Sequence, residues 1–312
     1  MKRLIVYHPG YNIRIPGASL VHPFDGAKFA KAYAMIQREV PDAGVRTLSP
    51  EGPISDEALE CFLTAEYRDA LNNKHTIVSA LEVRALRLLP MWLVQRWLLK
   101  PMRYAAAGTV LAAHQAVQGA VVWNLSGGYH HAAPDRGEGF CLLNDVGLAV
   151  QDLRRSGLLG MDDRCGIIDL DAHHGNGNAR CFLNDEKIRI LDAYEDGLCS
   201  RDPETRSRVD IALPFDHGTS GTRYLATLAP ALEDFFARGP MRLVFYNAGT
   251  DPYQGDRLAN FTLSEDDLVR RDQTVLTAAE RAGVPVVVMT SGGYSADSWH
   301  IIGRSVSAWL QA

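Results

Sequence analysis

The chain of 312 residues has the composition of an ordinary globular protein, with 46% hydrophobic residues, 22% charged residues and a formal charge of −5. This balance, with a pI near 6.1, offers no basic surface to a phosphate backbone, so we expect no nucleic-acid partner. Five cysteines, none spaced as Cys-x-x-Cys, argue against a disulfide framework and against a thiolate zinc site. From this cysteine usage we expect a reduced, cytoplasmic protein.

The N-terminal region contains two apolar stretches of different meaning. Residues 1–9 have too short an apolar run for a signal peptide and predict a first strand. Residues 84–104 are long enough to suggest a membrane segment, but Arg87, Pro90 and Arg96 interrupt the roughly 20 apolar residues that a spanning helix needs. We therefore expect no integral membrane segment. A helix packed in the core, or lining an apolar groove, is favoured over a membrane-surface helix.

The rest of the chain alternates apolar strands with amphipathic helices. Strands are predicted at 121–125, from 167, at 188–191 with Asp192 at its end, at 243–247 and at 284–289. Ser264 and Asp267 form a capping box for the helix that follows them. Near-continuous apolar strands separated by helices are typical of an α/β protein with a parallel sheet covered on both faces. No repeat or linker divides the chain, so we expect a single domain over residues 1–312.

The segment that begins at Ile167 carries the most distinctive chemistry. If it stays extended, Asp169, Asp171 and His173 fall on one face. Carboxylates at the end of an apolar strand carry a desolvation penalty that a bound cation would offset. The alternative is a loop-capping carboxylate beside a hydrogen-bonded core histidine. A catalytic zinc takes three protein ligands, so a further ligand must come from another segment.

Polar residues follow several predicted strands, at the edge where open α/β sheets bind ligands. We expect Asp251, in a Gly-Thr-Asp turn, to be the third metal ligand. A cation there would polarise a carbonyl and acidify water. His130 and His131 would provide a general base and acid, and Tyr294 would donate its O–H to an oxyanion. Together these groups predict amide hydrolysis.

Five motifs carry these residues: Ser126-Gly-Gly-Tyr-His-His131, Gly139-Phe-Cys-Leu-Leu-Asn-Asp145, Asp169-Leu-Asp-Ala-His-His-Gly-Asn-Gly177, Asn247-Ala-Gly-Thr-Asp251 and Ser291-Gly-Gly-Tyr294. Together they resemble the zinc-dependent histone deacetylase family over nearly the whole chain. Three further segments resemble its class IV branch: Tyr11-Asn12-Ile13, His22-Pro23-Phe24-Asp25 and Gly255-Asp256-Arg257-Leu258. The resemblance implies the three-layer arginase/deacetylase fold and hydrolysis of an acyl group from a lysine side chain.

The resemblance also implies roles for individual residues. Zinc would be held by Asp171, His173 and Asp251, and Gly139 and Phe140 would line an acyl-lysine tunnel. His131 would transfer the proton, while His130 would be held by Asp169. Asn176 stands where class I members carry Asp. The lost negative charge beside His131 should make its imidazole less basic.

A structural monovalent cation, which we expect to be potassium, is predicted beneath the zinc. Asp169, backbone oxygens of Asp171 and His173, and the Asp192 region would bind it. Without such an ion, the oxygen atoms of two acidic strand ends behind a divalent cation would not serve as ligands. The resemblance implies the same site.

Several functional alternatives remain open at this point. A ureohydrolase-like enzyme with two manganese ions shares the fold and the Asp-Ala-His string, but it needs a carboxylate where Gly175 stands. A silent acyl-lysine binding protein is another alternative. Substrates could be acyl-lysine proteins or peptides, or small acylated amines such as acetylpolyamines, because the site chemistry does not report what the amine is attached to.

The length of the preferred acyl group is a separate question. The class IV resemblance implies long fatty-acyl chains. An apolar wall beside the tunnel could come from Met91, Trp92, Leu93, Val94, Trp97 and Leu98. The alternative is that these residues are ordinary core and the tunnel ends at an acetyl-sized foot.

Overall fold

A computed structural model of the chain describes residues 1–13, 24–198 and 202–312. Within these residues an eight-stranded sheet has the order β2-β1-β3-β8-β7-β4-β5-β6, and all its neighbouring strands are parallel. The strands are β1 (Lys2–Val6), β2 (Thr47–Leu48), β3 (Ala120–Asn124), β4 (Cys165–Asp169), β5 (Ile188–Glu195), β6 (Ile211–Phe215), β7 (Leu243–Asn247) and β8 (Val286–Met289). The predicted α/β fold with a parallel sheet is confirmed.

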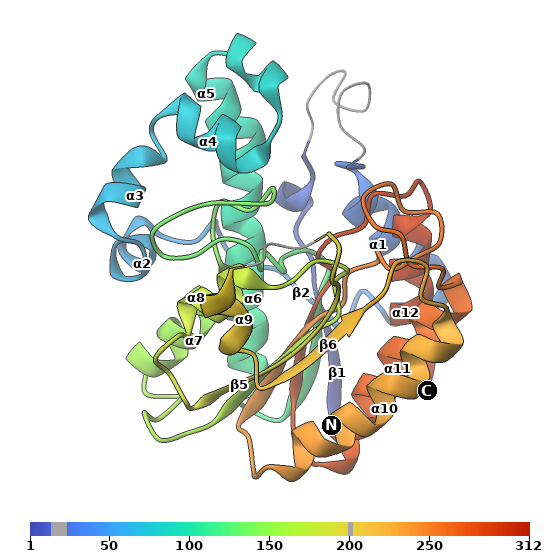
Figure 1. The fold of residues 1–312 in the computed structure, drawn as a ribbon. Helices are drawn as coiled ribbons and strands as arrows, with labels where there is room; N and C mark the ends of the chain where they lie inside the picture. Colours follow the sequence, from blue (N-terminus) through green and yellow to red (C-terminus); the bar gives the residue numbers. More distant parts are fainter. Residues whose placement is uncertain (14–23, 199–201) are drawn as a thin grey trace.

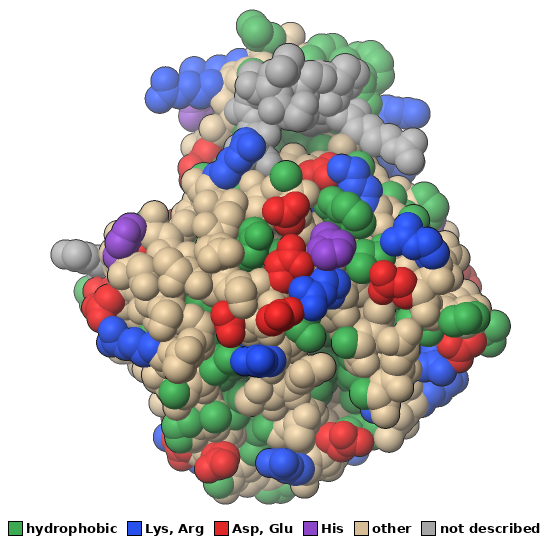
Figure 2. All heavy atoms as spheres, turned by 90° about the vertical axis from the view of Figure 1, so that its right-hand side faces the viewer, with side chains coloured by type: hydrophobic (Ala, Val, Ile, Leu, Met, Phe, Trp, Pro, Cys, Tyr) green, Lys and Arg blue, Asp and Glu red, His purple; other side chains and the backbone are tan. Residues whose placement is uncertain are grey.

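Helices cover both faces of this sheet (Figure 1). One face is covered by α1 (Lys28–Glu39), α10 (Gly221–Ala237), α11 (Glu265–Arg281) and α12 (Ser298–Gln311). The other is covered by α6 (Lys100–Ala116) and α7 (Asp145–Arg155). The short helices α8 (Asn176–Cys181) and α9 (Pro203–Ser207) follow β4 and β5, and the turn η1 (Pro9–Tyr11) follows β1. On the surface seen in Figure 2, acidic and basic side chains are interspersed.

Strand alternation builds the two apolar layers. In β4, Cys165 and Ile167 pack into the layer under α6 and α7, whereas Ile168 faces the layer under α10 to α12. Both faces of the strand are therefore buried, which explains its uninterrupted apolar sequence. The predicted capping box is present at the start of α11, where Ser264 and Asp267 exchange side-chain to backbone hydrogen bonds.

A helical lobe projects beyond the sheet on the side of α6 and has its own apolar cluster (Figure 1). It contains α2 (Asp56–Phe62), α3 (Ala65–Ala70), α4 (Lys74–Leu81), η3 (Arg84–Leu88), α5 (Met91–Val94) and the π-helical turn η4 (Gln95–Leu99). Pro90 separates η3 from α5. Among the described residues, no helix is long and apolar enough to cross a membrane. The stretch predicted as one packed helix is thus several short helical segments that lead into α6.

Two expectations about strand ends need correction. The extended backbone of β4 stops at Asp169, so Asp171 and His173 lie in the following loop rather than on a strand face. The Asp171 carboxylate accepts the backbone N–H of His173 at 3.0 Å, a local bond that turns the chain. Conversely, β5 runs on to Glu195, so Asp192 lies inside this strand, directly opposite Asp169.

Candidate active site

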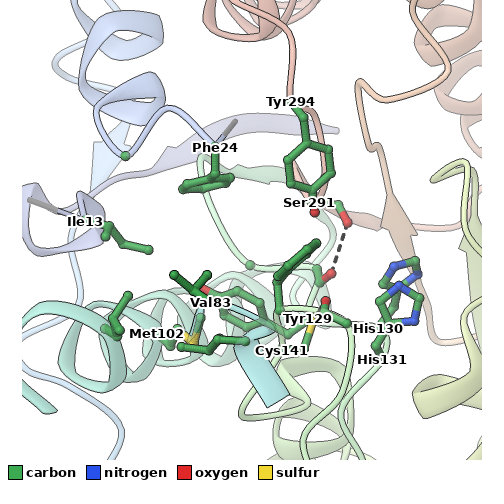
Figure 3. A pocket seen from close by; sticks show the side chains of 18 of the residues that line it. Ile13, Phe24, Val83, Met102, Tyr129, His130, His131, Cys141, Ser291 and Tyr294 are labelled. Carbon is green, nitrogen blue, oxygen red and sulfur yellow. Dashed lines mark hydrogen bonds between the residues drawn. The ribbon is translucent and has the colours of Figure 1, made fainter. Parts of the chain in front are cut away.

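The polar side chains predicted at strand ends gather at one edge of the sheet. In the order β3-β8-β7-β4, neighbouring strands lead into His130, Tyr294, Asp251 and Asp171 respectively. Because the strands are parallel, their carboxyl ends meet there. Figure 3 shows His130, His131 and Tyr294 around a single pocket.

Asp171, His173 and Asp251 form the candidate metal centre. One nitrogen or oxygen atom from each lies within 4.8 Å of the other two. A carboxylate oxygen of Asp171 and one of Asp251 each lie 3.1 Å from Nδ1 of His173. Asp251 also accepts the backbone N–H of Ala172 at 3.0 Å, which ties the two ligand loops together. The two carboxylates are buried.

The charges and donor atoms of this cluster fit a divalent cation. Burial and the neighbouring Asp171 carboxylate raise the pKa of Asp251 to about 8. Two buried carboxylates this close together do not both ionise readily unless a positive charge joins them. Two oxygen ligands and one nitrogen ligand suit zinc, and a three-residue set leaves a position for water and substrate.

The two adjacent histidines differ in charge. Nδ1 of His130 lies 3.0 Å from Asp169, and burial is outweighed by the charges of Asp169 and Asp171, which raise the pKa of His130 to about 9. His131 donates from Nδ1 to the amide oxygen of Asn176 at 2.6 Å. Burial and the charges of the neighbouring histidines hold its pKa well below the usual range. His131 is therefore a neutral ring whose Nε2 can accept a proton.

Asp169 is the centre of a buried hydrogen-bond network. Besides His130, it accepts from Nδ2 of Asn178 at 3.2 Å and from Nδ2 of Asn247 at 2.8 Å. These two amides come from α8 and the end of β7. The network fixes the orientation of the His130 ring.

Asp192 lies beside Asp169 and has an unusual environment. Its Oδ2 lies 2.5 Å from Nδ1 of His174 and accepts the backbone N–H of Gly175 at 3.0 Å. Its Oδ1 is buried and has no hydrogen-bond partner among the described residues. Burial, with the charge of Asp169, raises the pKa of Asp192 to about 6. An unsatisfied carboxylate oxygen at this depth fits a bound cation.

Tyr294 stands on a loop that several buried groups hold in place. Nζ of Lys28 donates to the carbonyl of Ser291 at 2.9 Å and to that of Gly292 at 3.2 Å. Asp256 accepts the backbone N–H of Tyr294 at 2.6 Å. Ser291 has a φ of 42°, and its hydroxyl donates to Asp171 at 3.0 Å. The loop is thus joined directly to the candidate metal centre.

The Tyr294 hydroxyl is suited to act as a donor. Burial, together with the carboxylates of Asp171 and Asp251, raises the pKa of Tyr294 well above its usual value. The phenol therefore stays protonated. In Figure 3 its ring points into the pocket toward the same region as Ser291.

The pocket has a volume of about 310 Å³ and a mainly apolar wall. Gly139 and Phe140, predicted from the resemblance to line a tunnel, lie on this wall. Six apolar residues of the stretch 91–98 were expected to form this wall, and of these, all of which the structure describes, only Leu98 lines the pocket. Trp92 is instead 62% exposed. The helical lobe instead contributes residues that precede that stretch, Leu81, Val83, Ala85, Leu86 and Leu89, and α6 contributes Met102.

Sequence reasoning missed the groups that support the site. Lys28 at the start of a helix has the sequence context of a solvated residue, yet it is fully buried. Asp256 belongs to the motif Gly255-Asp256-Arg257-Leu258, which does not indicate its contact with Tyr294. The signal that identifies each is a contact with a segment far away in the chain, which a single sequence does not display.

Comparisons with known proteins show the family of this chain. The family model of the histone deacetylase domain matches residues 22–310. The chain is 32% identical over 308 residues to histone deacetylase 2 of Arabidopsis thaliana, covering 97% of this chain and 77% of that protein. It is also 32% identical over 306 residues to an uncharacterized protein of Picosynechococcus sp., covering 96% and 95%. The chain belongs to the histone deacetylase family.

Solved structures show the same fold. A crystal structure of an HDAC homologue from Aquifex aeolicus superposes with a TM-score of 0.73 at 20% identity, covering all of this chain and 84% of that one. A structure of an HDAC homologue complexed with SAHA matches equally well, covering 99% and 84%. The expected arginase/deacetylase fold is confirmed, and membership of the family supports hydrolytic deacetylation.

Proposed function

We propose that this protein is a zinc-dependent hydrolase that removes acyl groups from lysine side chains of proteins or peptides. The observation that carries the proposal is the cluster of Asp171, His173 and Asp251, of which Asp171 and His173 line one apolar pocket together with a neutral His131 and a protonated Tyr294. We also propose that the whole chain forms one catalytic domain. The segments that resemble the class IV branch support membership of that branch, and the cysteine usage supports a cytoplasmic location. His22 and Pro23 of one motif lie outside the described residues.

Each group in the pocket has a definite role in amide hydrolysis. A zinc ion held by the cluster would supply Lewis acidity toward the substrate carbonyl and the attacking water. His131 would accept the proton of that water at Nε2 and deliver it to the leaving amine. His130, which Asp169 keeps protonated, would stabilise the negative charge that develops on the tetrahedral intermediate. Tyr294 would donate its O–H to the oxyanion.

The alternative with two manganese ions is not favoured. Among residues 1–13, 24–198 and 202–312, the Asp171 cluster is the one group of metal-ligating side chains with suitable spacing. A Cβ at Gly175, where a second ion would need a carboxylate, would lie 2.5 Å from Oδ2 of Asp169. A larger residue there would displace the carboxylate that holds His130.

The experiment that tests the proposed substrate class compares two sets of compounds. Acyl-lysine peptides with several acyl groups are assayed against acetylpolyamines under the same conditions. We expect the higher kcat/KM for the peptides. Faster hydrolysis of the polyamines would assign the enzyme to small acylated amines, and binding of peptides without turnover would make it a silent acyl-lysine binder.

The apolar pocket supports a preference for long acyl chains. Leu86, Leu89, Leu98 and Met102 line it beyond the catalytic groups. Each buried methylene contributes about 0.8 kcal/mol, so an octanoyl chain, about six carbons longer than acetyl, would gain up to ~5 kcal/mol. Part of this gain would appear as tighter binding rather than as faster chemistry.

The chain-length preference predicts an order of kcat/KM for one lysine peptide that carries acetyl, octanoyl or myristoyl groups. The longer chains should be hydrolysed best, and Leu89→Trp, which fills the pocket, should shift the preference toward acetyl. Leu88→Trp is the matched control, because Leu88 is 87% exposed. The preference would be contradicted if kcat/KM of wild type for the acetyl peptide exceeded that for the longer chains by about tenfold or more. Such a ratio corresponds to ~1.4 kcal/mol in the free energy of the transition state.

Lys28 is expected to act on catalysis by positioning Tyr294. Removing its ammonium in Lys28→Met frees the carbonyls that precede Tyr294, and a misplacement of about 1 Å can cost up to ~10²-fold in rate. We expect kcat to fall by roughly that amount. Lys31→Met is the control, because Lys31 pairs with Asp25 at the surface of the same helix. Equal kcat in the two variants would show that Lys28 does not position the loop.

The proposed potassium site can be tested through stability. An ion that binds only the folded state at ~100 times its Kd adds about 2.7 kcal/mol, so potassium should raise Tm relative to tetramethylammonium at equal ionic strength. Asp192→Asn, which removes the buried negative charge, should lose most of this increase. If potassium raised Tm equally in wild type and in Asp192→Asn, the ion would not bind at Asp192.

A further inference from the structure

A buried arginine on α11 joins the two loops that carry the proposed metal ligands. Nη1 of Arg271 donates to the carbonyl of Gly249 at 2.6 Å and to the carbonyl of Leu170 at 3.2 Å. Leu170 directly precedes Asp171, and Gly249 lies two residues before Asp251. Arg271 is fully buried. One guanidinium therefore contacts the backbone beside two of the three ligands.

The guanidinium is itself held rigidly. Oδ1 of Asp272 accepts from Nε of Arg271 at 3.0 Å and from Nη2 at 2.8 Å. The hydroxyl of Tyr246, on β7, donates to the same carboxylate oxygen at 2.5 Å. Asp272 neutralises a charge that would otherwise be buried alone. The planar fork of the arginine is fixed on one side by Asp272 and presents its other edge to the two carbonyls.

The two carbonyls need this donor because of where they lie. Leu170 and Gly249 follow the last residues of β4 and β7, where the regular strand pairing ends. Buried carbonyl groups without a donor carry a desolvation penalty. A lysine at position 271 offers a point charge and has no planar fork with which to span both carbonyls while still pairing with Asp272.

We propose that Arg271 is a positioning residue for the metal centre. By holding both carbonyls, it sets the separation of the Asp171 and Asp251 loops and thereby the affinity for the metal, without touching metal or substrate. The inference rests on the proposed function, since it assumes that the cluster binds zinc. Metal affinity is sensitive to such supporting contacts, because ligands must be held within about 0.5 Å of productive geometry.

The test measures zinc affinity rather than turnover. Metal-stripped wild type and variants are titrated with zinc in competition with a chromogenic chelator, and Tm of each metal-free protein is recorded. For Arg271→Lys we expect Kd to rise by about 10- to 100-fold. Tyr246→Phe, which removes one bond to Asp272, should raise Kd by a smaller factor. Arg304→Lys is the matched control, because Arg304 pairs with Glu265 and Asp266 at the surface of the start of α11.

The outcomes separate this inference from the proposed function. If Arg271→Lys lowers Tm of the metal-free protein but keeps wild-type zinc affinity, Arg271 only stabilises the fold and the inference is wrong. If Arg271→Lys does not fold, Tyr246→Phe decides, and an unchanged Kd in that variant overturns the inference. Wild type that binds no zinc would overturn the proposed function, and the inference with it.

Discussion

Asp251→Ala is expected to lose both the metal and the activity. The variant keeps one carboxylate and one imidazole, and two protein ligands do not complete the set that a catalytic zinc usually requires. Asp251 also accepts the backbone N–H of Ala172, so its removal loosens the loop that carries the other two ligands. Elemental analysis of the purified variant should find little or no zinc, and turnover of an acyl-lysine peptide should fall to background.

The control for this variant is Asp266→Ala, which removes an exposed carboxylate that pairs with Arg304. It should retain both zinc and turnover. If Asp251→Ala kept full zinc occupancy, the third ligand would be a different residue.

Tyr294→Phe should lower kcat without weakening the fold. Loss of one preorganised donor to an oxyanion typically costs ~10²–10³ in rate. The ring itself stays, together with its contacts to Phe24 and Phe140, so Tm should change little. Tyr33→Phe removes another partly buried hydroxyl, which donates to Thr47, and should leave kcat unchanged. Near wild-type turnover in Tyr294→Phe would remove this hydroxyl from the mechanism.

The sequence predicted the parts of the fold that depend on local pattern. Strands β3, β4, β7 and β8 are buried on both faces, so each is a nearly continuous apolar run that predicts a strand from the sequence alone. By contrast, β6 is partly exposed and contains Pro214, and β2 has only two residues, so neither carries such a run. The end of β5 lies three residues beyond the predicted one, because Asp192 has the sequence context of a strand terminus and only its pairing with Asp169 shows that the strand continues.

In the candidate site, too, the residues of short motifs are predictable from the sequence, whereas residues that act through long-range contacts are not. Asp171, His173 and Asp251 lie in short motifs with recognisable spacing, and the structure brings them together. Lys28 and Arg271 lie inside or at the start of ordinary helices, where a basic residue is typical of a solvated face. Their roles come from contacts with residues more than a hundred positions away, such as Ser291 and Leu170, and only the folded chain reveals those contacts.

Zinc-dependent restoration of turnover tests the central claim most directly. The protein is stripped of metal and titrated with zinc while hydrolysis of an acyl-lysine peptide is followed. We expect activity to rise from background and to reach its plateau at one zinc per chain, with manganese giving no comparable plateau at two ions per chain. Turnover that is unaffected by stripping, or that requires two manganese ions per chain, would contradict the account.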